Sequence, residues 1–241
     1  MKPFLILETG RPLDPLRRHG SFGHWIRVAA GLHGREVRHL DVIGGESLPA
    51  DASPYAGVFI TGSGSMVSDR EAWSERSAEW LREAAHAGTP MFGICYGHQL
   101  LAHALGGAVD YNPAGREMGT VAIALHDEAS SDPLFAGLGP RIDAQATHRQ
   151  SVLRVPEKAT VLARSDKDAH QAFRWGESVW GVQFHPEFST AMMKSYIHAR
   201  REALGSEGTC HHALLKGVRP APRARQVLRR FVRHARTLHA R

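Results

Sequence analysis

Short aliphatic runs alternate with helical patterns in the first half of the sequence, and this alternation constrains the fold more than any other feature. Strand-like runs bounded by turn residues occur at residues 4–7, 37–40, 57–61 and 91–94. Between them, Ser21 can cap one helix, and apolar residues at helical spacing predict another over residues 73–87. The predicted class is therefore α/β: an open, mostly parallel twisted sheet with helices on both faces.

The second half of the chain has more closely spaced strands and a helical end. Strand candidates cover residues 121–125, 161–164, 170–175 and 179–184, with Gly176-Glu177 as a hairpin turn between the last two. One helix is expected after Ser189 through Leu204, and another from about Ala221 to Leu238. We predict one domain over residues 1–241, in which residues 205–241 form a basic connector and a C-terminal helix packed on the rest.

The net positive charge of the chain comes from this tail. The formal net charge is +6, and residues 205–241 hold nine Lys/Arg against one acid, which is +8, so the first 204 residues carry −2. Val227, Phe231 and Ala235 recur at intervals of four, which predicts a helix that buries one apolar stripe while its arginines stay in water. Nucleic-acid binding by the tail is the less favoured alternative.

The composition, 42% hydrophobic and 22% charged residues, is typical of a globular protein. We found no run of about 18 apolar residues and no signal-peptide pattern, so a cytoplasmic protein that does not span a membrane is expected. Only two cysteines occur, Cys95 and Cys210, which argues against a disulfide framework.

Cys95 lies where a buried strand must turn sharply into a helix. The strand ends at Ile94, the helix begins almost at once, and Gly93 and Gly97 leave room for the turn. A helix N-terminus beside the sulfur favours the thiolate. This is the pattern of a nucleophile elbow, although a buried structural cysteine is the alternative for the segment taken alone.

A second strand ends in His185, followed by Pro186 and Glu187. His185 can take the proton of a thiol, while Glu187 can orient the imidazole ring and stabilise its charged form. Taken alone, the tripeptide is weak evidence, since most such tripeptides are solvated strand ends. Together with Cys95 it predicts a Cys-His-Glu catalytic triad.

The two segments together resemble the class I glutamine amidotransferases. Gly-Ile-Cys-Tyr-Gly-His-Gln at residues 93–99 is followed by Gly-Val-Gln-Phe-His-Pro-Glu at residues 181–187, as in that family, and the likeness is greatest to the amidotransferase domain of GMP synthetase. Residues 59–65 also match a loop that follows a strand in the family. The resemblance covers about residues 1–200 and implies a flavodoxin-like architecture.

The resemblance also implies how the substrate is bound. By position, the backbone amides of Ser63 and Tyr96 would form the oxyanion hole, and the remaining substrate-binding positions would be Gly62, Gly64, Gln99, His148, Gln150 and Ser151. The chain departs from the family at Ser63-Gly64, where Gly-Pro is usual, and at Gln150, where aspartate is usual. His148, Gln150 and Ser151 belong to a segment expected to be a loop.

The implied reaction is hydrolysis of the side-chain amide of L-glutamine through a Cys95 thioester, which gives glutamate and ammonia and needs no cofactor. The chain contains no phosphate-binding loop, so a separate synthase subunit could receive the ammonia. Two alternatives stay open: hydrolysis of other γ-glutamyl compounds by the same triad, and a catalytically silent domain that binds a ligand or partner.

A metal site is not predicted. Cys210, His211 and His212 are adjacent, but adjacent histidines point in different directions and no second Cys/His cluster has zinc-like spacing. A solvated loop is the favoured interpretation of this segment.

Overall fold

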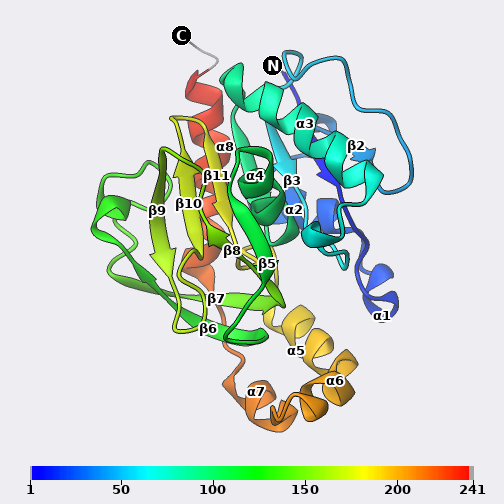
Figure 1. The fold of residues 1–241 in the computed structure, drawn as a ribbon, viewed down its shortest axis with the longest axis vertical. Coiled ribbons are helices and arrows are strands. Elements are labelled where there is room, and N and C mark those ends of the chain that lie inside the picture. Colours follow the sequence, from blue (N-terminus) through cyan, green and yellow to red (C-terminus); the bar gives the residue numbers. More distant parts are fainter. Residues whose placement is uncertain (1, 239–241) are drawn as a thin grey trace.

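A computed structural model describes residues 2–238. In this part of the chain, a nine-stranded sheet has the order β2-β1-β3-β4-β11-β10-β9-β6-β7, and β5 and β8 form a separate antiparallel pair (Figure 1). The first five strands in this order, β2, β1, β3, β4 and β11, pair in parallel. The remaining pairings, from β11 through β10, β9 and β6 to β7, are antiparallel. The α/β class is confirmed, with the antiparallel half made from the closely spaced strands.

The strand bounds are β1 Phe4–Glu8, β2 Val37–Asp41, β3 Gly57–Ile60, β4 Met91–Ile94, β5 Ala108–Tyr111, β6 Glu117–Leu125, β7 Arg141–His148, β8 Gln150–Arg154, β9 Ala159–Arg164, β10 Ala172–Trp175 and β11 Val179–Val182. The parallel strands β1, β3, β4 and β11 are apolar on both faces because helices cover both sides. The hairpin turn at Gly176-Glu177 is confirmed, since Trp175 pairs with Val179 across it.

The helix bounds are α1 Asp14–Arg17, α2 Phe22–Ala30, α3 Ala72–His86, α4 Tyr96–Ala104, α5 Thr190–Ala199, α6 Arg201–Ser206, α7 His211–Gly217 and α8 Pro222–Leu238. One face of the sheet packs against α2 and α8, and the opposite face packs against α3 and α4 (Figure 1). The predicted cap of α2 is confirmed: the Ser21 hydroxyl accepts a hydrogen bond from the amide of His24 at 3.1 Å.

The C-terminal helix α8 buries the predicted apolar stripe. Val227, Phe231 and Ala235 are fully buried in the core cluster on the α2 side of the sheet. The expectation that the arginines stay in water is wrong in part. Arg229 donates to the carbonyl of Ala29, at the C-terminal end of α2, and Arg230 donates to two carbonyls of the segment after β6.

The predicted single helix through Leu204 is also wrong, because α5 ends and α6 begins at Arg200, whose φ of −104° and ψ of 13° interrupt the helix. The connector holds a further helix, α7. Helices α5, α6 and α7 lie together at one end of the molecule (Figure 1). No helix within residues 2–238 has the length and apolar character needed to cross a bilayer.

Candidate active site

The predicted triad converges at the carboxyl ends of three adjacent parallel strands. The loop after β3 carries Ser63, Cys95 directly follows β4, and His185 lies three residues after the end of β11. Open α/β sheets bind ligands at this edge because loops from several strands meet there.

Cys95 occupies a strained turn between β4 and α4. Its φ of 52° and ψ of −102° lie in a region that residues other than glycine seldom adopt. The turn is possible only with small neighbours: a Cβ on Gly93 would overlap the carbonyl oxygen of Gly97, and a Cβ on Gly97 would overlap that of Ile60. The nucleophile elbow predicted from these glycines therefore has its steric cause in the packing of α4 on β3.

His185 and Glu187 form a buried hydrogen-bonded pair beside this turn. The Nδ1 atom of His185 lies 2.8 Å from Oε1 of Glu187, and both side chains are almost fully buried. The ring of Phe188 stacks on His185 with 4.2 Å between centroids, and the His185 amide donates to the carbonyl of Gln145 at 2.7 Å. The imidazole is thus held in one orientation from three sides.

The pKa shifts of these groups favour an ion pair between thiolate and imidazolium. Burial alone would raise the pKa of Cys95, but the charge and hydrogen bond of His185 together with the charge of His148 outweigh burial, and the net shift is downward. Burial would lower the pKa of His185, but the carboxylate of Glu187 and the sulfur of Cys95 raise it to about 10. A thiolate is the nucleophilic form of cysteine.

The loop after β3 is fixed by hydrogen bonds of two threonines. The hydroxyl of Thr9 donates to the carbonyl of Thr61 at 2.9 Å, and the Thr61 carbonyl also accepts the Gly97 amide at 3.1 Å. Ser63 accepts a hydrogen bond from the amide of Ser65 through its own hydroxyl at 3.1 Å, which closes a local turn despite the Ser-Gly departure.

Within residues 2–238, the backbone amides of Ser63 and Tyr96 donate no hydrogen bond, and both residues line the pocket beside Cys95. Gly62 makes room for His185, since a Cβ there would lie 3.1 Å from the ring. Gly64 has open space where its Cβ would be, so no contact explains this glycine.

A pocket of about 240 Å³ opens in front of Cys95. Its walls come from the loop after β3, from Cys95 and α4, from the end of β7 and start of β8, and from the junction of α5 and α6: Ser63, Gly64, Ser65, Met66, Cys95, Tyr96, Gln99, Arg116, Thr147, His148, Arg149, Gln150, Arg200 and Ala203. This volume is small for a ligand site and suits a molecule the size of an amino acid.

The predicted loop at residues 147–152 is instead the junction of two strands, with only Arg149 between β7 and β8. Gln99 is buried, and its Nε2 donates to the carbonyl of Gln150 at 2.7 Å and to Oε1 of Gln183 at 2.9 Å. The Nε2 of Gln150 donates to the hydroxyl of Ser68 at 2.5 Å. Gln99 and Gln150 thus join the walls of the pocket to each other.

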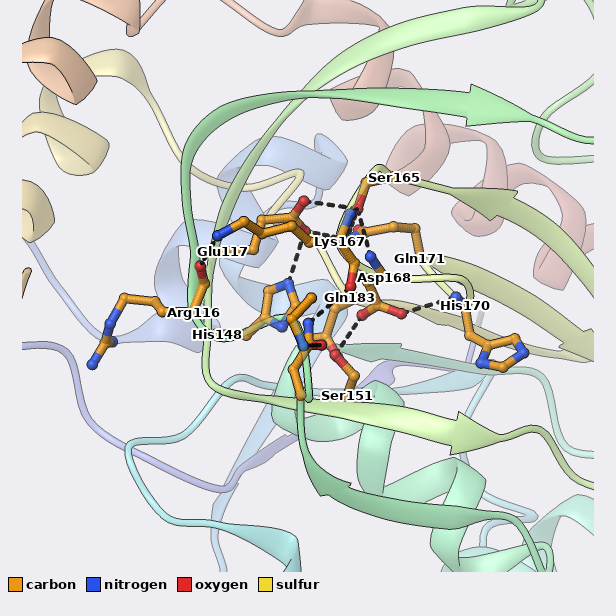
Figure 2. A network of polar contacts seen from close by, with 12 residues as sticks. Arg116, Glu117, His148, Ser151, Ser165, Lys167, Asp168, His170, Gln171 and Gln183 are labelled. Atoms are coloured by element: carbon orange, nitrogen blue, oxygen red, sulfur yellow. Dashed lines mark hydrogen bonds and ion pairs between the residues drawn. The ribbon is translucent and has the colours of Figure 1, made fainter. Parts of the chain in front are cut away.

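A buried polar network lies behind the pocket (Figure 2). His148 places Nδ1 at 2.9 Å from the carbonyl of Gln150 and Nε2 at 3.0 Å from Oε2 of Glu117. Burial would lower the pKa of His148, but the hydrogen bond to Glu117 and the negative charges of Asp168, Glu117 and Cys95 together outweigh burial, and the net shift is upward. The charge of His148 in turn lowers the pKa of Cys95.

Ser151 belongs to this network and not to the pocket wall. Its hydroxyl donates to Oδ2 of Asp168 at 2.8 Å (Figure 2), and Ser151 is not among the residues that line the pocket. The sequence analysis missed Glu117 and the three arginines of the pocket wall, Arg116, Arg149 and Arg200. Nothing in their local sequence marks them, because Glu117 reaches His148, and the arginines reach the pocket, only through the pairing of β6 with β7 and the break between α5 and α6.

Outside the pocket, Cys210 is exposed at the start of α7, next to the paired rings of His211 and His212. A group of three or more side chains of histidine, cysteine, aspartate or glutamate that could hold a metal ion does not occur in residues 2–238.

Comparison with known proteins adds independent information on this arrangement. Residues 22–201 match the family described as glutamine amidotransferase class-I. The chain is 34% identical over 174 residues to a protein of Methanopyrus kandleri that is named as a subunit of GMP synthase (glutamine-hydrolyzing), and the alignment covers 70% of this chain and 85% of the relative. It spans only 33% of a longer GMP synthase from Bacteroides fragilis.

A second kind of relative carries another activity in its name. The chain is 32% identical over 178 residues to the gamma-glutamyl-L-1-hydroxyisopropylamide hydrolase of a Pseudomonas species, covering 68% of this chain and 60% of the relative. Among solved structures, a glutamine amidotransferase of Thermotoga maritima superposes with a TM-score of 0.76 at 21% identity, over 98% of this chain and 99% of the other. This last likeness concerns the fold.

Proposed function

Because the chain belongs to the class I glutamine amidotransferase family, we propose that it hydrolyses the side-chain amide of L-glutamine to glutamate and ammonia, with Cys95, His185 and Glu187 as its catalytic triad. The observation that carries the proposal is the strained placement of Cys95 beside the buried His185–Glu187 pair, at the base of a pocket of amino-acid size.

In the first half of the reaction, the Cys95 thiolate attacks the amide carbon of glutamine and forms a C–S bond. The carbonyl oxygen becomes an oxyanion, which the free amides of Ser63 and Tyr96 can stabilise from the positive end of α4. His185 gives its proton to the amide nitrogen, the C–N bond breaks, and ammonia leaves.

The second half reverses these roles. Water attacks the γ-glutamyl thioester while neutral His185 takes its proton, a second oxyanion forms in the same place, and the C–S bond breaks. Glutamate leaves, and Cys95 and His185 return to the ion pair. Every bond change uses side chains and backbone dipoles of this chain.

The fate of the ammonia is the second part of the proposal. The name of the M. kandleri relative describes one subunit of a synthase, and this chain covers 85% of its length. We therefore propose that a separate synthase subunit receives the ammonia.

A second candidate function is hydrolysis of another γ-glutamyl amide, which the Pseudomonas relative's name favours. The same triad would form the same thioester, and the leaving group would be a larger amine in place of ammonia. The two functions differ only in the group that must fit beside the scissile nitrogen.

The test is release of ammonia and glutamate by the purified chain, with glutamine and a γ-glutamyl alkylamide compared at equal concentration. Glutamine should give the higher kcat/KM, and Cys95→Ala should abolish hydrolysis without unfolding the chain. Faster turnover of the alkylamide would favour the second candidate.

Labelling keeps the test informative if turnover requires a partner protein. An electrophilic glutamine analogue, reactive at the amide carbon, should label Cys95 alone, since Cys210 is exposed and lies outside the pocket. Excess glutamine should block this labelling. Peptide mapping that finds no labelling of Cys95, or labelling that glutamine does not suppress, would leave a catalytically silent domain as the better description.

A further inference from the structure

Three arginines line the pocket in front of Cys95, and two of them form no salt bridge with a carboxylate within residues 2–238. Arg116 pairs with both carboxylate oxygens of Glu207, at 2.8 and 2.9 Å. Within residues 2–238, neither Arg149 nor Arg200 forms a salt bridge. The pocket wall contains no aspartate or glutamate. An anion in the pocket would thus meet two guanidinium groups that form no salt bridge within residues 2–238.

Arg200 is half-buried and is held in place by the protein. Its Nη1 donates to the hydroxyl of Thr147 at 2.7 Å, and its guanidinium lies over the ring of Tyr196, 5.4 Å from the centroid. A guanidinium has five N–H donors, and only one of those on Arg200 has an acceptor within residues 2–238. Burial, followed by the charge of Arg116, lowers its pKa, as expected for a cation that lacks a partner.

The other strong donors around the pocket are already in use. Both hydrogens of the Gln99 amide group go to Gln150 and Gln183, and both ring nitrogens of His148 contact protein oxygens. Arg149 is exposed, lies over the ring of Tyr111 at 5.1 Å, and has no hydrogen-bonded acceptor within residues 2–238. Of the three pocket arginines, Arg200 and Arg149 are therefore the two that form no salt bridge within residues 2–238, whereas Arg116 is held by Glu207.

We propose that Arg200, assisted by Arg149, binds the α-carboxylate of the substrate and thereby selects a glutamyl unit with a free carboxyl group. This inference rests on the proposed function. The planar guanidinium fork matches the two oxygens of a carboxylate. Glutamine has a single carboxylate, at the end opposite its amide, and its leaving group carries no negative charge. The break between α5 and α6 at Arg200 is what brings this side chain to the pocket.

The experiment compares kcat/KM for L-glutamine and for L-glutamine α-amide, in which the carboxylate is neutral, in three proteins. These are the original chain, Arg200→Gln, and the control Arg201→Gln. Arg201 is the next residue, is exposed, pairs with Glu202 and does not line the pocket. The original chain and Arg201→Gln should prefer glutamine by the same factor. Arg200→Gln should reduce that preference on the order of 10- to 100-fold, mainly through a lower rate with glutamine.

A second pair of substrates distinguishes binding of the α-carboxylate of the glutamyl unit from binding of a carboxylate on the leaving group. γ-Glutamylglycine carries an extra carboxylate on its leaving group, and γ-glutamylglycinamide does not. If Arg200→Gln changes the preference within this pair and leaves the glutamine pair unaltered, Arg200 binds the leaving group and the inference is overturned. An unchanged preference in both pairs overturns it as well.

Failure of the inference is distinguishable from failure of the proposed function. If the original chain hydrolyses neither glutamine nor a γ-glutamyl compound, the proposed function fails. If it hydrolyses glutamine and Arg200→Gln keeps the preference over the α-amide, only the role of Arg200 fails. Alkylation of Cys95 by neutral iodoacetamide at an unchanged rate shows that the variant still forms the elbow.

Discussion

In the proposed mechanism Glu187 acts only through His185, so the loss of Glu187 and the loss of His185 should differ in their effect on the rate. Oε1 of Glu187 contacts Nδ1 of His185, and Oε2 has no hydrogen-bond partner within residues 2–238. In Glu187→Gln the amide oxygen can still accept from Nδ1, which keeps the ring in place but removes the negative charge. We expect kcat/KM for glutamine to fall on the order of 10- to 100-fold, against roughly 1,000-fold or more for His185→Ala. An equal loss in steady-state assays of both variants would contradict these roles.

The thiolate–imidazolium pair at the same site also predicts a broad pH profile. The thiolate exists above the lowered pKa of Cys95, and the imidazolium exists below the raised pKa of His185, about 10. The rate of Cys95 alkylation should therefore be flat through neutral pH and fall as pH drops through the Cys95 pKa. The kcat/KM for glutamine should also fall as pH rises towards 10. Cys95 alkylation that increases steadily from pH 7 to 9, as for an ordinary thiol, would contradict the ion pair.

Helix α4 carries a further buried histidine, His98, whose protonation should affect the stability of the fold and not the chemistry of the site. His98 packs against the ring of Phe173, with 4.9 Å between centroids, and against Gly181 of β11. Burial lowers the pKa of His98 to about 4. Between pH 6.5 and 4 the unfolded chain binds more protons at this position than the folded chain, so stability is lost as the pH falls.

Once His98 is protonated in both the folded and the unfolded chain, this pKa shift lowers the free energy of unfolding by about 3 kcal/mol. His98→Leu should remove that part of the acid sensitivity, so urea unfolding at pH 7 and pH 4.5 should give more similar free energies than in the original chain. His212→Leu, at an exposed position on α7, is the matched control and should keep the original difference. If both variants lose stability in acid as the original chain does, His98 is not the source.

The elements that sequence patterns predicted well are those whose own residues decide their structure. Strand β4 is apolar throughout, and the α2 cap needs only Ser21 and a nearby amide, so both were evident locally. Strand β7 was missed because its buried positions include alanines and alternate with polar residues, giving a weak apolar signal. Its structure depends on eight registered pairs with β6, which lie about 20 to 30 residues earlier in the chain.

The same distinction holds for the candidate site. Cys95, His185 and Glu187 follow the ends of strands that are recognisable from the sequence, so the motif also indicates where these residues lie in the sheet. Glu117 contacts His148 from an antiparallel strand, and Arg200 lines the pocket from a helix break, and neither position could be inferred before the chain was folded. Sequence patterns therefore predict the proposed reacting groups better than the residues that we propose bind the rest of the substrate.

At the scale of the whole molecule, the basic tail serves as the cover of one sheet face. Of the seven arginines between residues 219 and 236, five donate hydrogen bonds to other parts of the chain: Arg219, Arg223, Arg229, Arg230 and Arg236. Arg219 reaches Asp143 of β7 and Arg236 reaches Glu36, which precedes β2, so these contacts extend across the width of the sheet. This use of the charges supports an intramolecular role for the tail over nucleic-acid binding.

Phe231 is the centre of this cover, and its loss should separate stability from chemistry. Its ring lies 5.0 to 6.3 Å from the rings of Phe4, Phe59, Phe92 and Trp180, on four neighbouring parallel strands. Phe231→Ala should lower the free energy of unfolding by about 3 to 5 kcal/mol, because it leaves a cavity between α8 and the sheet. Arg233→Ala, at an exposed position on the same helix, should change it by less than about 0.5 kcal/mol.

The melting temperature of Phe231→Ala should then fall by roughly 10 °C, while kcat/KM for glutamine well below that temperature stays within about twofold of the original, since α8 does not line the pocket. Calorimetry and the glutamine assay on the same preparations measure both quantities. An unchanged melting temperature would mean that α8 is not docked in solution, and the nucleic-acid interpretation of its arginines would gain support. A large loss of activity in a folded Phe231→Ala protein would instead show that α8 positions β4 and Cys95 through the sheet.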